Sequence, residues 1–455
     1  MGAYLSEPLT AKETAFGRGD GFAWSSSCMQ GWRLSMEDAH ITLHELGDEL
    51  QHLALFCVFD GHGGREVARF CERHFTEALR LKVLSLRPTQ SSRPSGVKPW
   101  QPTDVEEGGG EVEDLGADLG PGLIGKAMGE TFLDMDRLLV QPESEEELMS
   151  LKANAGGSNG QGSSSGSAAS GNAPLVQMQA KLQNDIAQDV DKARTIGRLS
   201  SEEAARLAIK MSFAKRLEGL RPQDMPSGGE KAADNVGCTA VCAVLAPSHI
   251  VVANAGDSRA VLCRSGKPVP LSEDHKPNAE RETKRIESAG GFIKEVKVKN
   301  PNGVEHTTYR VNGVLSLSRA IGDLRFKGVS GLTAAQQVIT AVPDIHIEPR
   351  TPQDEFIVLA CDGVWDVKSS AEVCTFVRSR LRRGEPVQQV IEHLLDACLA
   401  KDPRKTTGIG GDNMTCIVVV LPGLASAEDV AADQDEDHLN SVRRCSQMRC
   451  LKNLF

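Results

Sequence analysis

Four aspartates share a sequence environment that could assemble a metal site. Asp60, Asp257, Asp362 and Asp412 each lie beside a glycine at one edge of an apolar, strand-like run. Antiparallel strands can bring such edges together at one rim of a sheet, where the carboxylates would repel one another and hard cations would relieve the repulsion. Carboxylates plus a backbone carbonyl, without a Cys or His set, favour Mg²⁺ or Mn²⁺ over Zn²⁺. The alternative is that the four aspartates mark four independent turns.

Two further side chains could act on a phosphate held by such ions. His62 follows Asp60 and Gly61 and is either a turn residue between glycines or a proton donor that works near neutral pH. Its place beside Asp60 favours the proton donor. Arg33 precedes Glu37 by four residues, and taken alone these two residues suggest a surface ion pair.

The elements that would position these residues can be read from apolar patterns. The run Leu53–Gly64 (LALFCVFDGHGG) predicts a buried strand that ends at Asp60, and a similar run ends before Asp362. Short connections between the apolar runs of residues 237–263 indicate antiparallel pairing. Helices are expected where apolar residues recur every three or four positions, namely about 67–79, 125–140, 200–217, 278–288 and 387–398.

The order of these patterns predicts one interrupted domain. Residues 1–20 are expected to form a loose arm, and residues 21–423 the domain itself. An insertion at about 86–235 is expected to be partly disordered, because its Gly/Ser-rich run 156–171 cannot bury enough apolar surface. Residues 424–455, acidic and then basic, are expected to form a mobile tail.

Composition excludes several functional classes. The 455-residue chain carries a net charge of -11, which argues against a broad nucleic-acid-binding surface. Its twelve cysteines show no zinc-ligand spacing and are expected to be buried thiols in a reducing compartment. No apolar run is long enough to span a membrane and no secretory signal opens the chain, so an intracellular protein is expected. Met1–Ser6 fits the N-myristoylation pattern, with Gly2 as the acceptor.

Six sequence segments can be compared with known families. They are RLSMEDAH (33–40), VFDGHGG (58–64), GDSRAVL (256–262), VLSLSRAIGD (314–323), LACDGVWDV (359–367) and GDNMT (411–415). In this order they resemble the metal-dependent Ser/Thr protein phosphatases of the PP2C (PPM) family, and together they span nearly the whole chain outside the insertion. The opening MGAYLSEP and the long insertion after the first helix further resemble the gamma isoform of that family.

The resemblance implies an α+β fold, an α-β-β-α sandwich of two antiparallel sheets flanked by helices, with a binuclear metal cleft at one end. On that template Asp60 bridges two Mg²⁺ or Mn²⁺ ions and the carbonyl of Gly61 joins one of them. Asp362 and Asp412 hold the other ion.

The same template gives roles to four more residues. Glu37 and Asp38 act directly or through waters, and Asp257 with Asp362 would hold a third, weaker ion. Arg33 would bind the substrate phosphate, for which a planar guanidinium is well suited.

The implied reaction needs no covalent phosphoenzyme. A water that bridges two divalent ions loses a proton near neutral pH and can attack phosphorus in line, while His62 would protonate the leaving seryl or threonyl oxygen. Arg319 and the hairpin before it are expected to form a flap that contacts substrate, although Arg319 could equally pair with an acid.

Two other functions are less consistent with the sequence than a phosphatase. A catalytically dead scaffold that binds phosphoproteins is disfavoured, because every expected metal-site acid is present. A two-metal hydrolase acting on nucleic acid is disfavoured by the acidic charge and the absence of a basic, aromatic-bearing stripe. The expected partners are therefore phosphoprotein substrates of a monomeric cytoplasmic enzyme. Nuclear entry is allowed but unmarked by a basic cluster, and an acyl group on Gly2 would give only reversible membrane contact.

Overall fold

The computed structural model describes residues 4–86, 120–153, 231–299, 303 and 305–424. Its first sheet has six antiparallel strands, and the strand nearest the C-terminus lies in the middle of it. In spatial order the strands are β1 (Leu9–Gly19), β2 (Phe22–Gly31), β14 (Met414–Val420), β13 (Asp354–Ala360), β7 (Arg259–Arg264) and β8 (Lys267–Pro270).

The second sheet is also antiparallel. Its central strands are continuous apolar runs because both of their faces are covered. In spatial order the strands are β12 (Asp344–Pro349), β6 (His249–Ala255), β5 (Gly237–Leu245), β4 (Ala54–His62) and β3 (Ala39–Leu43), with the short β11 (Ile321–Gly322) paired to β5.

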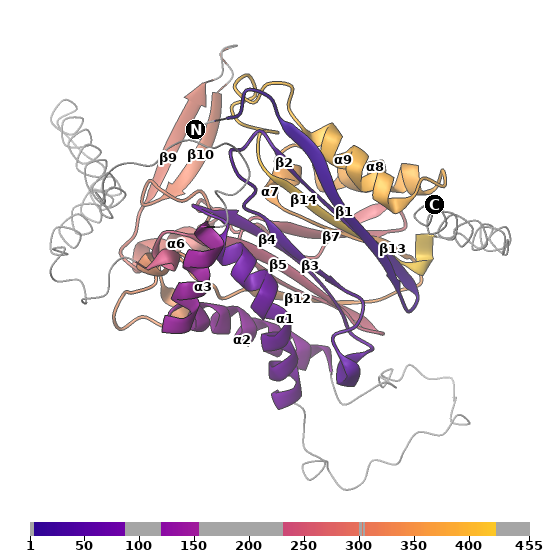
Figure 1. Cartoon of the computed structure of the whole chain (residues 1–455), viewed down its shortest axis with the longest axis horizontal. Helices are drawn as coiled ribbons and strands as arrows, with labels where there is room; N and C mark the ends of the chain where they lie inside the picture. The colour runs from indigo at the N-terminus through magenta and orange to yellow at the C-terminus, as the bar shows by residue number, and fades with distance from the viewer. Residues whose placement is uncertain (1–3, 87–119, 154–230, 300–302, 304, 425–455) are drawn as a thin grey trace, which may run out of the picture.

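Helices cover the outer face of each sheet (Figure 1). The second sheet is covered by α1 (Glu66–Leu86) and α2 (Pro121–Leu139), with α3 (Pro142–Ala153) packed against α1. The first is covered by α8 (Ser370–Leu381) and α9 (Val387–Cys398), after the short α7 (Asp362–Trp365). A smaller unit combines α6 (Glu280–Ser288) with the hairpin of β9 (Ile293–Lys299) and β10 (Glu305–Val311). Short 3-10 turns lie at Asp48–Leu50, Ala232–Asp234, Leu324–Phe326, Ala334–Gln336 and Pro422–Leu424.

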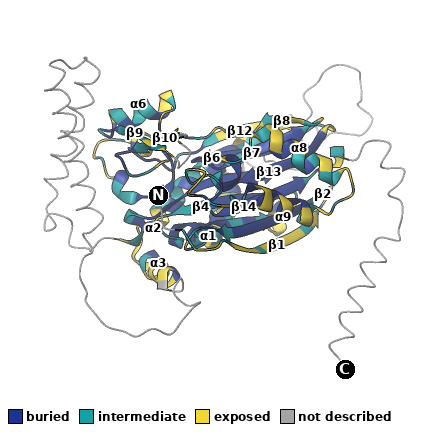
Figure 2. Cartoon of the chain, turned by 90° about the horizontal axis from the view of Figure 1, so that it is seen from above, coloured by how far each residue is buried: buried dark blue, intermediate teal, exposed yellow. Residues whose placement is uncertain are grey.

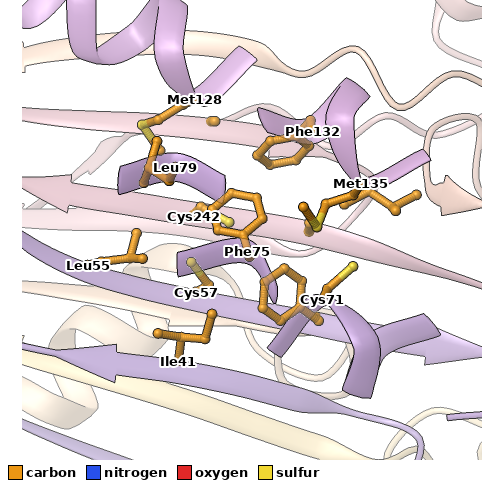
Figure 3. Close-up of a cluster of buried hydrophobic side chains, with 14 of the residues drawn as sticks. Ile41, Leu55, Cys57, Cys71, Phe75, Leu79, Met128, Phe132, Met135 and Cys242 are labelled. Carbon is orange, nitrogen blue, oxygen red and sulfur yellow. The ribbon is translucent and has the colours of Figure 1, made fainter. Parts of the chain in front are cut away.

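Apolar side chains fill three layers of core. The inner faces of the two sheets meet around Phe56, Val241 and Ile417. Figure 2 shows that the central strands are buried, whereas the edge strand β1 is largely exposed. Between the second sheet and its helices, the Phe75 ring packs edge-on against Phe59 and Phe132, with centroids 5.7 and 5.5 Å apart. Figure 3 shows Phe75 and Phe132 within this cluster. Such a pair stabilises the fold by roughly 0.5–1.5 kcal/mol beyond area burial, so α2 is an integral part of the core.

The α+β sandwich expected from the sequence is confirmed, with two corrections. Residues 9–19 form the edge strand β1 and not a loose arm, because they pair with β2 and contact α9 through Lys12 and Asp396 at 2.6 Å. Strand β4 also extends past Asp60 to His62, since it remains paired with β5 through those residues.

Part of the predicted organisation lies outside the described residues. The 86–235 insertion contributes α2 and α3 to the fold, whereas its Gly/Ser-rich run 156–171 and the helix expected over 200–217 lie outside the described part. The same holds for Gly2 and for residues 425–455 of the expected tail. Among the helices that are described, none has the length and apolar character needed to cross a membrane.

Candidate metal centre

The four aspartates of the sequence pattern gather at one end of the two sheets. Asp60 lies near the end of β4, where it is paired with Thr239 of β5. The Thr239 hydroxyl lies 2.8 Å from the Ser258 hydroxyl. Ser258 directly follows Asp257, so the β6–β7 turn is adjacent to the end of β4. In the other sheet, Ala360 pairs with both Arg259 and Cys416. The ends of β13, β7 and β14 are therefore level, and the acids carried beside those ends face one region.

Two glycines allow the backbones at this end to approach closely. A Cβ on Gly61 would lie 2.2 Å from the carbonyl oxygen of Glu37, and a Cβ on Gly363 would lie 2.0 Å from that of Asn413. Real Cβ atoms do not approach oxygen so closely, so only glycine fits at either position. The loop with Glu37 consequently lies directly against β4, and the start of α7 lies against the start of β14.

The carboxylates at this end oppose one another's ionisation. Burial, and then the charges of Asp362, Asp38 and Asp412, raise the pKa of Asp60 well above its ordinary value. Burial and then Asp412 and Asp257 do the same to the pKa of Asp362. Burial raises the pKa of Asp38 to about 7, although a hydrogen bond from Thr415 opposes the rise. Without added cations, the site therefore favours partly protonated acids.

Two protein cations already lie against the outer acids. Arg33 donates a short hydrogen bond to Asp412, and Lys276 Nζ lies 2.7 Å from Asp257 Oδ2 and 3.8 Å from Asp366 Oδ1. Burial would lower the pKa of Lys276, but the charges of Asp257 and Asp366 raise it above its ordinary value. Both side chains thus compensate negative charge that the acids cannot neutralise among themselves.

The donors suit Mg²⁺ or Mn²⁺, although the acids are not drawn tightly together. Within the described ranges, no group of three or more His, Cys, Asp or Glu side chains is arranged to hold an ion directly. Mutual repulsion keeps such carboxylates apart, and Mg²⁺ keeps several waters while binding only one or two carboxylates. Asp60 and Asp362 oppose each other's ionisation, and a hard cation bound nearby would relieve that repulsion.

The loop of residues 33–38 is fixed by a residue that sequence reasoning missed. The Asn413 side-chain amide donates to the carbonyls of Gln30 and Ser35, and its oxygen accepts the Glu37 backbone N–H at 3.0 Å. Glu37 also accepts from the Ser35 hydroxyl at 2.8 Å, whereas Arg33 pairs with Asp412. The Arg33–Glu37 ion pair, one reading of the sequence, is therefore not the arrangement adopted.

His62 has a buried carboxylate partner that sequence reasoning also missed. Its Nε2 lies 2.6 Å from Oδ2 of Asp323, whose side chain is 1% exposed. Burial would lower the pKa of His62, but the charge and hydrogen bond of Asp323 raise it above the ordinary value. A signal was available, because Asp323 follows Gly322 after an apolar residue, as Asp257 follows Gly256 and Asp412 follows Gly411.

Arg319 lies in a buried ionic network beneath the small α6 unit. The residue is 5% exposed, its Nη2 lies 2.6 Å from Glu282, and its Nη1 lies 2.9 Å from Asp344. Glu282 is itself only 1% exposed and also accepts from Arg285 and Ser318. Pairing with an acid, the structural alternative for Arg319, is the arrangement in this fold.

Comparison with known proteins identifies the family to which the chain belongs. It belongs to the protein phosphatase 2C family, whose family model, described as "Protein phosphatase 2C", matches residues 22–93 and 147–407. Its class is therefore that of the metal-dependent protein phosphatases.

Particular relatives match over most of their length. "Probable protein phosphatase 2C 5" of Paramecium tetraurelia is 32% identical over 421 residues, covering 92% of this chain and 100% of the relative. "Protein phosphatase ppm-1.G" of Caenorhabditis elegans is 32% identical over 518 residues, covering 92% and 98%. The crystal structure of serine-threonine phosphatase 2C from Toxoplasma gondii matches with a TM-score of 0.50 and 18% identity over 92% of this chain and 98% of that one, a likeness of fold.

Proposed function

We propose that the chain hydrolyses phosphoserine and phosphothreonine in proteins, with Mg²⁺ or Mn²⁺ and without a covalent phosphoenzyme. The observation that supports this best is the gathering of Asp60, Asp362 and Asp412 beside Arg33 at one end of the sandwich. Acids at this density attract cations, and a guanidinium among them suits the oxygens of a phosphate that the same cations hold. A phosphate monoester is the ligand that uses both.

We assign the metal sites to oxygen donors at this end of the sandwich. When bound, the ions would lower the pKa of a water and neutralise phosphate charge. Two ions would be held by Asp60, the Gly61 carbonyl, Asp362 and Asp412, with Glu37 and Asp38 acting directly or through waters. Asp257 with Asp362 would hold a third, weaker ion.

Arg33 and His62 act on the substrate in this proposal. Arg33 would transfer its hydrogen bond from Asp412 to the phosphate, since its side chain is 43% exposed and can reach solvent. His62 would donate a proton to the seryl or threonyl oxygen, which leaves poorly as an alkoxide. The raised pKa of His62 keeps that proton available near neutral pH.

Phosphate release from a phosphothreonine peptide tests the proposal. With Mn²⁺ the wild type should release phosphate, and excess EDTA should abolish the release. Asp60→Asn should lower kcat by roughly two or more orders of magnitude, the scale of losing a principal electrostatic group, because it removes a negative charge that would hold the ions. Asp48→Asn, on an exposed turn, is the matched control and should be fully active. Release that persists in EDTA and in Asp60→Asn would refute the metal-dependent reaction.

We further propose a monomeric, cytoplasmic enzyme with phosphoprotein substrates and access to the nucleus. The gamma-type resemblance rests on the opening MGAYLSEP and on the long insertion. The same opening supports myristoylation of Gly2, which would give reversible membrane contact. Mass spectrometry of the N-terminal peptide, isolated from eukaryotic cells, should show the acyl adduct. An unmodified peptide would remove the basis for membrane contact.

A further inference from the structure

The partner of His62 is held in a conformation that few residues adopt. Asp323 has φ 50° and ψ 39°, in the left-handed region, where aspartate is tolerated better than most residues. Its backbone N–H donates to the Val236 carbonyl at 3.0 Å, and its carboxylate is buried against His62. A buried carboxylate in a strained backbone position needs support from its surroundings.

Strand β5 leaves the space in which the two side chains meet. Gly237 is opposite both His62 of β4 and Gly322 of β11 in the sheet. A Cβ on Gly237 would lie 2.5 Å from Asp323 Oδ2 and 2.8 Å from His62 Nε2. Any larger residue at this position would separate the carboxylate from the imidazole.

The loop that carries Asp323 is anchored from the insertion. Asp136 of α2 accepts the Gly322 N–H at 2.9 Å and the Lys327 ammonium at 2.6 Å. Lys327 also donates to the Ala320 carbonyl at 2.7 Å. Residues on both sides of Asp323 are thus fixed by one helix, and that helix is packed into the core.

The other ring nitrogen of His62, Nδ1, differs from Nε2 in its hydrogen bonding. Nδ1 is buried, and within the described residues it has no hydrogen-bond partner. Buried polar atoms without partners are rare and need an explanation such as a group supplied by a ligand. The imidazole is therefore fixed through Nε2 and unsatisfied at Nδ1.

We propose that Asp323 is a positioning residue for His62: it accepts the Nε2–H and thereby leaves Nδ1 to carry the proton for the leaving oxygen. The oxygen of a water molecule forms a new bond to phosphorus and releases a proton to solvent, and the bond from phosphorus to the seryl or threonyl oxygen breaks. The electron pair of the broken bond goes to that leaving oxygen, which takes the proton from Nδ1. The ring becomes neutral and continues to donate its Nε2–H to Asp323. This assignment rests on the proposed phosphatase function and adds a residue to it.

Leaving groups of different basicity test this role. A phosphothreonine peptide needs a proton on its alkoxide, whereas p-nitrophenyl phosphate releases a weakly basic phenolate. Asp323→Asn should lower kcat roughly 100-fold on the peptide, the scale of a lost general acid, and far less on p-nitrophenyl phosphate. KM for the peptide should hardly change. Equal losses on the two substrates would show that Asp323 is only structural.

Comparing the double variant with the two single variants measures the energetic coupling between His62 and Asp323. In a His62→Gln background, Asp323→Asn should cause no further loss on the peptide, because residues that act as a unit are not additive. An additional 100-fold loss would overturn the assignment. Wild type that releases phosphate from neither substrate with Mn²⁺ would instead refute the proposed function, so the two failures are distinguishable.

A milder variant covers the case in which Asp323→Asn does not fold. Asp136→Asn keeps an acceptor for the Gly322 N–H but weakens the pairing with Lys327, and so loosens the loop from a distance. It should lower the peptide-to-aryl ratio of kcat severalfold while leaving the aryl phosphate rate close to that of the wild type. A ratio equal to that of the wild type, or a loss shared by both substrates, would refute positioning by this loop.

Discussion

Replacing Asp38 by asparagine should stabilise the metal-free protein at high pH. Folding raises the pKa of Asp38 from 3.8 to about 7, so the folded state binds more protons than the unfolded state between these values. Stability therefore falls as pH rises through this interval. At about 1.4 kcal/mol for each tenfold change in proton affinity, the interval corresponds to about 4 kcal/mol above pH 7. Asp38→Asn removes this cost and retains an oxygen that can accept from Thr415.

Thermal unfolding in EDTA measures the effect. At pH 8 the midpoint of Asp38→Asn should exceed that of the wild type by on the order of 5 °C, and the difference should vanish near pH 4, where the aspartate is protonated. Saturating Mn²⁺ should reduce the difference, because cations stabilise the carboxylate. Asp48→Asn, on an exposed turn, should leave the midpoint within 1 °C or so at both pH values. An equal midpoint for Asp38→Asn and wild type at pH 8, or an equal gain at both pH values, would refute the reasoning.

Three further perturbations follow from single contacts. Gly61→Ala should lower the peptide kcat at least roughly tenfold, because its Cβ would clash with the adjacent loop. At Gly129 an added Cβ would meet nothing within 4 Å in the described part of the chain, so Gly129→Ala should raise the free energy of unfolding in urea by roughly 0.5–1 kcal/mol. A Gly61→Ala variant with wild-type kcat, or a Gly129→Ala variant that is less stable than the wild type, would contradict this account of the packing. Lys276→Met should tighten Mn²⁺ binding, measured by calorimetry, roughly fivefold, because it removes the ammonium group that competes with the metal for the Asp257 carboxylate. An unchanged affinity would exclude that competition. Arg319→Met should cost roughly 3–5 kcal/mol by leaving Glu282 buried and unpaired, and a raised KM with unchanged stability would instead favour the flap role.

The buried strands were predictable from sequence, whereas the edge strand was not. Strands β4, β5 and β13 are continuous apolar runs, because their positions inside the sandwich bury both faces. Strand β1 is mostly polar, with Phe16 65% exposed, and its order comes from pairing with β2 and from contacts such as Thr14 with Glu392 at 2.7 Å. Such contacts join residues far apart in sequence and leave no local pattern.

The candidate site shows the same division. Asp60, Asp362 and Asp412 can be predicted as candidate ligands because an aspartate beside a glycine at a strand edge is a local signal. The roles of Asn413 and Asp323 come from hydrogen bonds to Glu37 and His62, hundreds of residues away. Composition and spacing do not indicate those contacts. The recurring Gly-Asp pair, however, marks Asp323 as a further candidate residue.

The central place of β14 determines when the end of the sandwich that carries the candidate metal site can form during synthesis. Arg33 and Asp412 are 379 residues apart in the chain, yet they touch because β14 inserts between β2 and β13. Until the ribosome has released that strand, β2 and β13 keep unpaired edges that can template aggregation. A nascent chain that ends before residue 412 therefore lacks Asp412, the Asn413 side chain that holds the Glu37 loop, and the strand between β2 and β13. Activity and escape from aggregation should therefore appear at the same stage of translation.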